Sequence, residues 1–268
     1  MTNTRRLLLT GLLSLVWIAA TLALLRVVGP DWGRFLPATC LASHCFCETP
    51  RTGQLLLQPA NSWSSFGFVL VGSWIMLGAG TRPHSALAGP AALWLGITAV
   101  IIGVGSAALH ASLTLWGQFA DVLGMYLLGS FTLVWAVMRW RGFSPRAAAA
   151  LYLLVAGGLI AALWLWPETR RWLFAVLLFI AIAAEWWLAR PRRRDVRAGL
   201  LLAGLGANIL AFAIWIADQT RTLCAPDSLV QGHAAWHVLG AVAVACSYGY
   251  YRSETARNPG GQARGRIQ

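Results

Sequence analysis

The sequence has no lysine and few charged residues of any kind. Only 11% of its 268 residues are charged, whereas 58% are hydrophobic and the mean hydropathy is +0.62. Soluble domains carry about 25% charged residues, so this composition excludes an ordinary soluble globular protein. It predicts instead an all-α, polytopic membrane protein.

All 21 basic residues are arginines, and the formal net charge is +12. Such an excess of positive charge is also found in proteins that bind nucleic acids. Here, however, the arginines lie in short segments between apolar runs, where the positive-inside rule of membrane proteins accounts for them. We therefore expect no nucleic-acid partner.

Eight apolar runs are long enough to cross a bilayer, which takes about 20 residues each. They lie at 7–28, 61–79, 90–112, 117–138, 147–166, 171–189, 198–217 and 233–251. They predict a seven-helix core at 61–251, preceded by a membrane anchor helix at 1–28 and a connector at 29–60, and followed by a tail at 252–268. The first run is long for a signal peptide and no clear A-x-A site follows it, so we expect an uncleaved anchor. Cleavage is the alternative, and it would leave the seven-helix core in the same orientation.

The distribution of the arginines predicts that orientation. With the N-terminus in the cytoplasm, fifteen arginines fall inside and six fall outside, as the positive-inside rule requires. The inside set is Arg5, Arg6, Arg82, Arg139, Arg141, Arg146, Arg190, Arg192, Arg193, Arg194, Arg197, Arg252, Arg257, Arg264 and Arg266, and the outside set is Arg26, Arg34, Arg51, Arg170, Arg171 and Arg221. Both termini and the 252–268 tail are thus expected to be cytoplasmic, in a bacterial inner or plasma membrane. The connectors at 29–60 and 218–232 are expected to be extracytoplasmic.

Five polar residues stand out because polar side chains are costly inside a membrane. Ser106, His110 and Asp121 lie in the stretch 103–121, and His233 and His237 lie one helical turn apart in the last run. In the predicted orientation the three histidines and Asp121 lie at the same depth, near the extracytoplasmic ends of their helices, and Ser106 lies one turn deeper than His110. This agreement favours a single functional site.

Three histidines with a nearby carboxylate in apolar sequence predict a zinc site with one open coordination position. We expect His110, His233 and His237 to bind the metal, Asp121 to act as general base on the zinc-bound water, and Ser106 to donate a hydrogen bond to a developing oxyanion. Two alternatives remain. The residues could be polar groups that hold helices together, or two of the histidines could ligate a haem, which leaves the third histidine and Asp121 without a role.

Two further acidic residues lie in apolar runs. Glu185 is near the predicted inner end of its helix, and we expect it to pair with Arg190 or Arg192. Asp218 ends a helix on the side of the candidate site, where it either orients a ligand histidine or caps the connector.

Four of the five cysteines lie in the two predicted extracytoplasmic connectors. They are Cys40, Cys45, Cys47 and Cys224, whereas Cys246 lies within a helix. An oxidising compartment favours disulfides, and four cysteines can pair in three ways. Cys45 and Cys47 are too close in sequence to be expected partners. Free thiols or a metal cluster are the alternative.

Together these residues resemble the alkaline ceramidase family, within the wider group of seven-helix membrane hydrolases that includes the adiponectin and progestin receptor proteins. The resemblance covers residues 45–250, and its motifs are Gly105-Ser106-x-x-x-His110, Gln118-x-x-Asp121, Trp215-x-x-Asp218 with Cys224, and His233-x-x-Trp236-His237. It implies a seven-helix core, zinc on the three histidines, a catalytic role for Asp121, an assisting role for Ser106, and hydrolysis of ceramide to a sphingoid base and a fatty acid. It also implies a disulfide between Cys47 and Cys224, which leaves Cys40 with Cys45.

The sequence departs from this family before the first core helix, where animal members carry an acidic calcium cluster. Only Glu48 and Asn61 resemble retained oxygen ligands, and Gln58 stands where a glutamate is expected. A hard cation takes several charged oxygens, so this stretch argues against calcium binding.

The sequence therefore predicts a zinc-dependent amidase that acts on the linear amide of a ceramide-like lipid drawn from the bilayer. The main alternative is a receptor-like seven-helix membrane protein with a structural zinc site. A transporter or proton relay is a third possibility, and the lack of paired half-helices argues against it. The sequence leaves the oligomeric state open.

Overall fold

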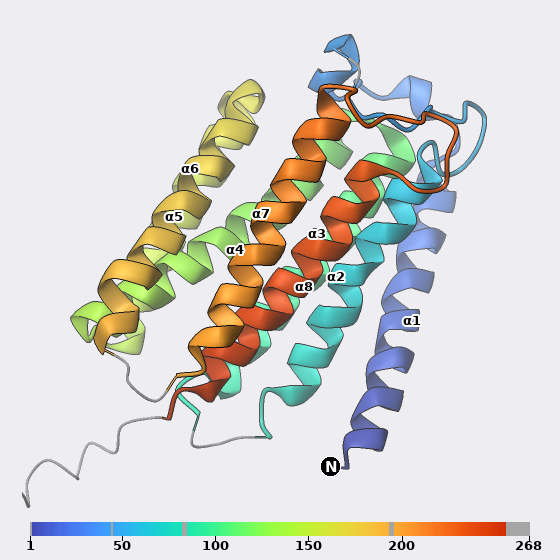
Figure 1. The fold of residues 1–268 in the computed structure, drawn as a ribbon. Coiled ribbons are helices and arrows are strands. Elements are labelled where there is room, and N and C mark those ends of the chain that lie inside the picture. Colours follow the sequence, from blue (N-terminus) through green and yellow to red (C-terminus); the bar gives the residue numbers. More distant parts are fainter. Residues whose placement is uncertain (1, 44, 82–84, 193–195, 256–268) are drawn as a thin grey trace, which may run out of the picture.

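A computed structural model describes residues 2–43, 45–81, 85–192 and 196–255. In this part of the chain there are eight α-helices and no β-strand, which confirms the all-α prediction (Figure 1). The helices are α1 (Asn3–Val28), α2 (Pro59–Gly78), α3 (Gly89–Ser112), α4 (Leu115–Arg141), α5 (Pro145–Leu165), α6 (Arg170–Ala183), α7 (Ala198–Gln219) and α8 (Gly232–Ser253). A π-helical segment, Ala184–Ala189, continues α6, and short 3₁₀ turns occupy Trp32–Arg34, Thr39–Ser43, Pro167–Thr169 and Arg190–Arg192.

Six of these helical segments are long and apolar enough to cross a membrane, which confirms the polytopic class. The two that are not apolar enough are α2 and α8. Both carry buried polar side chains, among them Asn61 and Ser65 on α2 and His233 and His237 on α8. Polar side chains inside a membrane bundle face other helices rather than lipid. The two least apolar helices therefore contribute buried polar groups to the interior of the bundle.

The core of the bundle is a layer formed by α2, α3, α4 and α8. Helix α2 packs on α3 and α8, and α3 packs on α4, while α1 lies against α2 at the edge of the bundle (Figure 1). Helices α5 and α6 pack on α4, and α7 packs on α8. Helix α6 is thus an outer neighbour of α4, and α7 is an outer neighbour of α8.

The approach of α3 to α4 depends on Gly105. A Cβ atom on this residue would lie only 2.9 Å from the backbone nitrogen of Asp121, a distance at which something has to move. The two helices are also joined by a turn of two residues, in which the Thr114 hydroxyl caps α4 by accepting a hydrogen bond from the Gly117 N–H at 3.2 Å. Close packing and a short turn place Ser106 beside Asp121.

The two long connectors meet at one end of the bundle. The segment between α1 and α2 and the segment between α7 and α8 lie together there, whereas the N-terminus and the end of α8 lie at the opposite end (Figure 1). Several arginines used to predict the orientation lie outside the described residues, namely Arg82, Arg193, Arg194, Arg257, Arg264 and Arg266. The same is true of the predicted tail after residue 255.

The predicted pairing of Glu185 with Arg190 or Arg192 is wrong. Glu185 lies in the π-helical segment and is buried against α4, where its carboxylate accepts a hydrogen bond from Arg139 at 2.6 Å and one from the Tyr250 hydroxyl at 2.7 Å. The extra residue per turn in a π-helix changes the direction in which the following side chains point. This network lies at the end of the bundle where α8 finishes.

Candidate metal centre

Three buried imidazole rings meet between α3 and α8. His110 comes from the last turn of α3, and His233 and His237 come from the first two turns of α8, on the same face because they are four residues apart. The ring centroids of His110 lie 4.8 Å from His233 and 5.0 Å from His237, and those of His233 and His237 lie 4.6 Å apart. Each offers a ring nitrogen, and these nitrogens lie within 4.8 Å of one another. The structure thus brings together the three histidines that the sequence singled out.

Two of the rings are oriented by hydrogen bonds from α2 and from the residue before it. The Nδ1 atom of His110 lies 2.9 Å from the amide oxygen of Gln58, and the Nδ1 atom of His237 lies 2.8 Å from the Ser64 hydroxyl. An amide oxygen can only accept, so His110 donates through Nδ1 and its Nε2 atom carries a lone pair. Ser64 donates to the Asn61 carbonyl at 3.0 Å, which makes it an acceptor for His237 as well.

Two of the ring nitrogens in the cluster have no hydrogen-bond partner among the described residues, as expected of metal ligands. Nε2 of His110 and Nδ1 of His233 are buried and have no hydrogen-bond partner in the described structure. Leaving a buried polar nitrogen without a partner costs about 1–3 kcal/mol, so unpaired imidazoles gathered at one point are unfavourable unless something binds them. Neutral imidazole nitrogens are favoured metal ligands. The cluster could therefore hold a metal ion.

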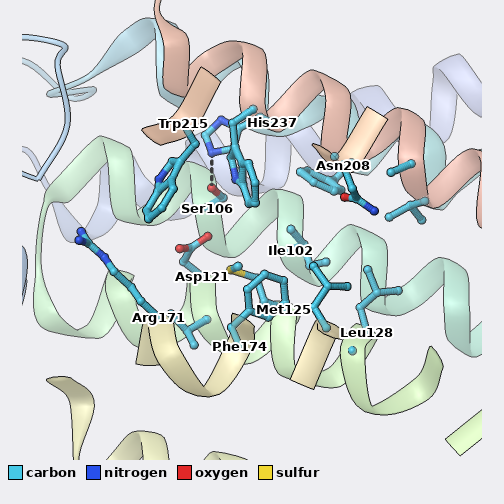
Figure 2. A pocket seen from close by; sticks show the side chains of 18 of the residues that line it. Ile102, Ser106, Asp121, Met125, Leu128, Arg171, Phe174, Asn208, Trp215 and His237 are labelled. Atoms are coloured by element: carbon cyan, nitrogen blue, oxygen red, sulfur yellow. Dashed lines mark hydrogen bonds between the residues drawn. The ribbon is translucent and has the colours of Figure 1, made fainter. Parts of the chain in front are cut away.

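Ser106 and Asp121 lie beside the cluster. The Ser106 hydroxyl is 3.1 Å from Nε2 of His237, and the Asp121 carboxylate, from α4, faces the same space (Figure 2). Because His237 donates through Nδ1, Ser106 is the donor in its bond to Nε2. All five polar residues predicted to share a site are thus neighbours in the structure.

A cavity of about 200 Å³ begins at this group and extends into the bundle. Ser106, Asp121, His233 and His237 line one part of it, and hydrophobic side chains such as Leu95, Ile102, Leu128 and Val244 line another. Its walls include Arg171, Phe174 and Leu178 of α6 and Asn208, Phe212 and Trp215 of α7. Figure 2 labels Arg171, Phe174, Asn208 and Trp215 among them. The cavity therefore lies between the pair α4 and α6 and the pair α7 and α8. Its lining is polar at the end near the histidines and apolar at the other end.

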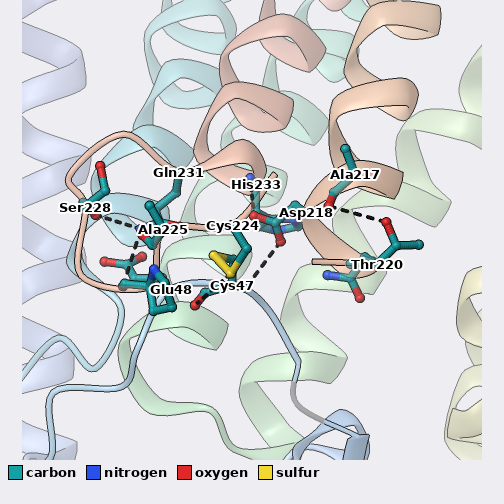
Figure 3. The surroundings of a disulfide bond; sticks show 12 residues. Cys47, Glu48, Ala217, Asp218, Thr220, Cys224, Ala225, Ser228, Gln231 and His233 are labelled. Carbon is teal, nitrogen blue, oxygen red and sulfur yellow. Dashed lines mark hydrogen bonds between the residues drawn. A yellow bond between two sulfur atoms is a disulfide. The ribbon is translucent and has the colours of Figure 1, made fainter. Parts of the chain in front are cut away.

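Asp218 positions His233 through the backbone. One of its carboxylate oxygens accepts the backbone N–H of His233 at 3.2 Å, and the other accepts the backbone N–H of Cys47 at 3.2 Å (Figure 3). The sequence left open whether Asp218 orients a histidine or caps a connector. The structure combines the two functions, because the carboxylate caps the first turn of α8 and so sets the position of His233 without touching its ring.

Two disulfides hold the connectors, and they are the pairs that the family resemblance implies. Cys47 is bonded to Cys224 and Cys40 is bonded to Cys45. The Cys47–Cys224 bond joins residues 177 positions apart and lies next to Asp218 (Figure 3). It thereby ties the connector before α2 to the connector that leads into His233.

The segment compared above with a calcium cluster has other contacts in this structure. Both carboxylate oxygens of Glu48 accept backbone N–H groups at the start of α2, from Ala60 at 2.8 Å and Asn61 at 2.9 Å. Burial raises the pKa of the Glu48 carboxyl, and these two hydrogen bonds oppose that effect. Gln58, considered in the sequence only as a replaced calcium ligand, holds His110 and also donates to the Glu48 carbonyl at 2.8 Å.

Sequence reasoning missed Gln58 and Ser64 as partners of the imidazoles. The available signal was the run of polar residues at the start of an otherwise apolar helix, Asn61-Ser62-Trp63-Ser64-Ser65. A metal-binding histidine usually donates the N–H of its other ring nitrogen to an oxygen atom. A polar run of this kind can supply such oxygen atoms.

The fold and the site together define a polytopic helical membrane protein with a buried three-histidine centre at the end of an apolar cavity. The family model for ceramidases matches residues 46–263, which is most of the chain, and the chain belongs to this family. The match begins after α1. No curated protein matches the chain. Family membership indicates a membrane-embedded hydrolase that acts on lipid.

Loss of the Gln58 side chain is expected to weaken metal binding. Gln58→Leu removes the oxygen that fixes the His110 tautomer, so the affinity for Zn²⁺ should fall by about 10–100-fold. A chelator-competition titration of the purified protein measures this. Gln54→Leu is the control, because Gln54 is an exposed residue of the same connector and lies outside the cavity lining. Equal affinities in the two variants would show that Gln58 has no role in metal binding.

Removal of the Cys47–Cys224 disulfide is expected to destabilise the protein. The double variant Cys47→Ser, Cys224→Ser opens the longest covalent loop of the described structure, which should lower the free energy of unfolding by about 2–5 kcal/mol. Thermal unfolding in detergent measures the change, with Cys246→Ser as control because Cys246 forms no disulfide. An unchanged melting temperature in the double variant would contradict the stabilising role.

Proposed function

We propose that the protein is a zinc-dependent intramembrane amidase that cleaves the linear amide bond of ceramide or a ceramide-like lipid to a sphingoid base and a fatty acid. The observation that carries the proposal is the buried cluster of His110, His233 and His237, with Ser106 and Asp121 beside it at the mouth of an apolar cavity. Membership of the ceramidase family supports the lipid amide as substrate.

In this proposal His110, His233 and His237 hold the zinc ion. When bound, zinc supplies an acidic water and polarises the amide carbonyl. The Asp121 carboxylate takes the proton of the attacking water and later returns it to the amide nitrogen as the amine leaves. The Ser106 hydroxyl lies on the Nε2 side of His237, and it would donate to the developing oxyanion when Nε2 serves as a metal ligand.

The number of ligands favours a catalytic zinc site over the structural site of a receptor-like protein. Structural zinc sites are almost always closed by four protein ligands, whereas catalytic ones keep a position for water. The group found among the described residues contains three histidines and borders a cavity. A carboxylate and a hydroxyl that face this cavity have a clear role in hydrolysis and none in a closed site.

We further propose that the lipid enters from the side, between the pairs α4–α6 and α7–α8 that line the cavity. We also propose a division of the chain into an anchor helix at 1–28, a connector at 29–60, a core at 61–251 and a tail at 252–268. The arginine distribution supports cytoplasmic termini in a bacterial inner or plasma membrane, with the site towards the extracytoplasmic side.

Substitutions at the site are expected to separate metal binding from chemistry. Alanine in place of His110, His233 or His237 should release zinc and abolish hydrolysis. Asp121→Asn should retain zinc but lose about 10²–10⁴-fold in turnover, because the amide cannot accept a proton. Ser106→Ala should retain zinc and lose about 10²–10³-fold. Metal content by mass spectrometry, measured together with ceramide hydrolysis, tests each variant.

Two outcomes would contradict these roles. Loss of zinc from Asp121→Asn would make Asp121 a ligand and would favour a closed, structural site. Full activity in the same variant would place the base elsewhere. Ser73→Ala is a suitable control, because Ser73 is a buried serine of α2 outside the cavity lining and should leave both zinc and turnover unchanged.

The orientation is tested by labelling single cysteines in intact cells. In a Cys246→Ser background, a cysteine at Ser228, in the α7–α8 connector, should react with an impermeant thiol reagent. A cysteine at Phe143, in the α4–α5 turn, should react only after the cells are opened. Phe143 is exposed and Ser228 is partly exposed, so accessibility depends on the side of the membrane. The reverse pattern would overturn the proposed orientation.

A further inference from the structure

Gln118 belongs to the motif Gln118-x-x-Asp121, of which the proposed hydrolysis uses only the second residue. It lies in the first turn of α4, one turn before Asp121, so both side chains are on the same face of the helix. The residue is only 2% exposed, yet it lines the cavity together with Asp121 and Ser106. The polar end of the cavity therefore contains an amide to which the proposed reaction gives no role.

The orientation of the Gln118 amide is fixed by Thr39, in the connector before α2. The Oε1 atom of Gln118 accepts two hydrogen bonds from Thr39, one from the backbone N–H and one from the hydroxyl, each at 3.0 Å. A backbone N–H can only donate, so the atom that faces Thr39 is the oxygen and the other is the NH₂ nitrogen. Both lone pairs of the oxygen are occupied. Towards a ligand, Gln118 is therefore a donor and not an acceptor.

The segment that carries Thr39 is held against the turn between α3 and α4. The backbone N–H of Ala38 donates to the Leu113 carbonyl at 2.8 Å. The Cys40–Cys45 disulfide closes a short loop directly after Thr39. The Gln118 amide is thus positioned before a ligand arrives, as electrostatic stabilisation of a transition state requires.

The Nε2 atom of Gln118 opens onto the cavity. It donates to no other described residue, and protein atoms do not seal it in, although the side chain as a whole is buried. Cys40, the residue after Thr39, packs with Phe46, and both line the cavity. The Phe46 ring lies against that of His233, with 4.2 Å between centroids. The free N–H groups of the amide are therefore on the side of the cavity that holds the histidines.

Helix geometry places Gln118 at the level of the histidines. Residues 113–114 join α3 to α4, and at 1.5 Å per residue His110 lies about 5 Å and Gln118 about 7 Å from this turn along their helices. Ser106 and Asp121 both lie about 11 Å from it, where their side chains face each other (Figure 2). Two hydrogen-bond donors, Ser106 and Gln118, thus border the polar end of the cavity from different helices and at different depths.

We propose that Gln118 is a second hydrogen-bond donor to the carbonyl oxygen of the scissile amide, acting together with Ser106. The proposal rests on the amidase function and adds a residue that touches the substrate. In an amide bond the carbonyl oxygen accepts hydrogen bonds and the N–H donates, so a side chain that can only donate binds the oxygen. The hydrogen bond strengthens as negative charge develops on this oxygen, and it is retained by the carboxylate of the fatty-acid product.

Three variants separate the donor from the link to Thr39. Gln118→Glu keeps an oxygen for Thr39 but presents a carboxylate oxygen to the cavity, and Gln118→Met removes the donor without adding charge. At about pH 9, where a glutamate is ionised, both should retain zinc and lose about 10²–10³-fold in kcat. Thr39→Val removes one hydrogen bond of the link but leaves the NH₂ group in place, so it should lose less than about 10-fold. A purely structural role of Gln118 would give the reverse order for Gln118→Glu and Thr39→Val.

Binding of the product separates this proposal from the amidase function. The shift in melting temperature is recorded with a long-chain fatty acid and with the fatty alcohol of the same length. The acid should stabilise the wild type and Thr39→Val more than the alcohol does, and this difference should shrink in Gln118→Met. If it does so while no ceramide is hydrolysed, only the amidase proposal fails. An equal difference in the wild type and Gln118→Met, or turnover of both Gln118 variants close to that of the wild type, would overturn the role of Gln118.

Discussion

Three imidazole rings buried at one point in a membrane bundle are the constraint on which the site depends. Inside such a bundle, ring nitrogens cannot turn to bulk water for partners. Gln58 and Ser64 bind the Nδ1 atoms of His110 and His237, which leaves their Nε2 atoms with lone pairs. Both partners lie at the start of α2 or just before it. The packing of α2 against α3 and α8 thus determines which ring nitrogens of His110 and His237 carry a proton.

The connector before α2 holds two helices in place at once. The side chain of Glu48 caps α2 by accepting two of its N–H groups, and the preceding residue, Cys47, is joined to Asp218 and Cys224. Asp218 in turn caps α8 at His233. Two adjacent residues therefore anchor the helix that carries the orienting oxygens and the helix that carries two histidines. The connector therefore fixes the positions of α2 and α8 relative to each other.

The cavity combines a polar end and an apolar remainder, which suits hydrolysis of a lipid. The polar end brings together groups that can bind a metal, accept a proton and donate a hydrogen bond, and the rest accommodates hydrocarbon. Because the apolar walls exclude bulk water, electrostatic interactions at the polar end are stronger than they would be in water.

The sequence by itself determined the all-α membrane class and the eight helices, because hydropathy is a local property of the chain. It also singled out the five polar residues that the structure brings together. Family resemblance added the disulfide pairs. The tertiary structure alone decided that Glu185 pairs with Arg139, that Gln58 binds His110, and that Asp218 acts through the backbone of His233. Such contacts join residues far apart in sequence. They depend on how each helix is rotated and how closely it approaches its neighbour, as at Gly105, and no local pattern specifies that rotation.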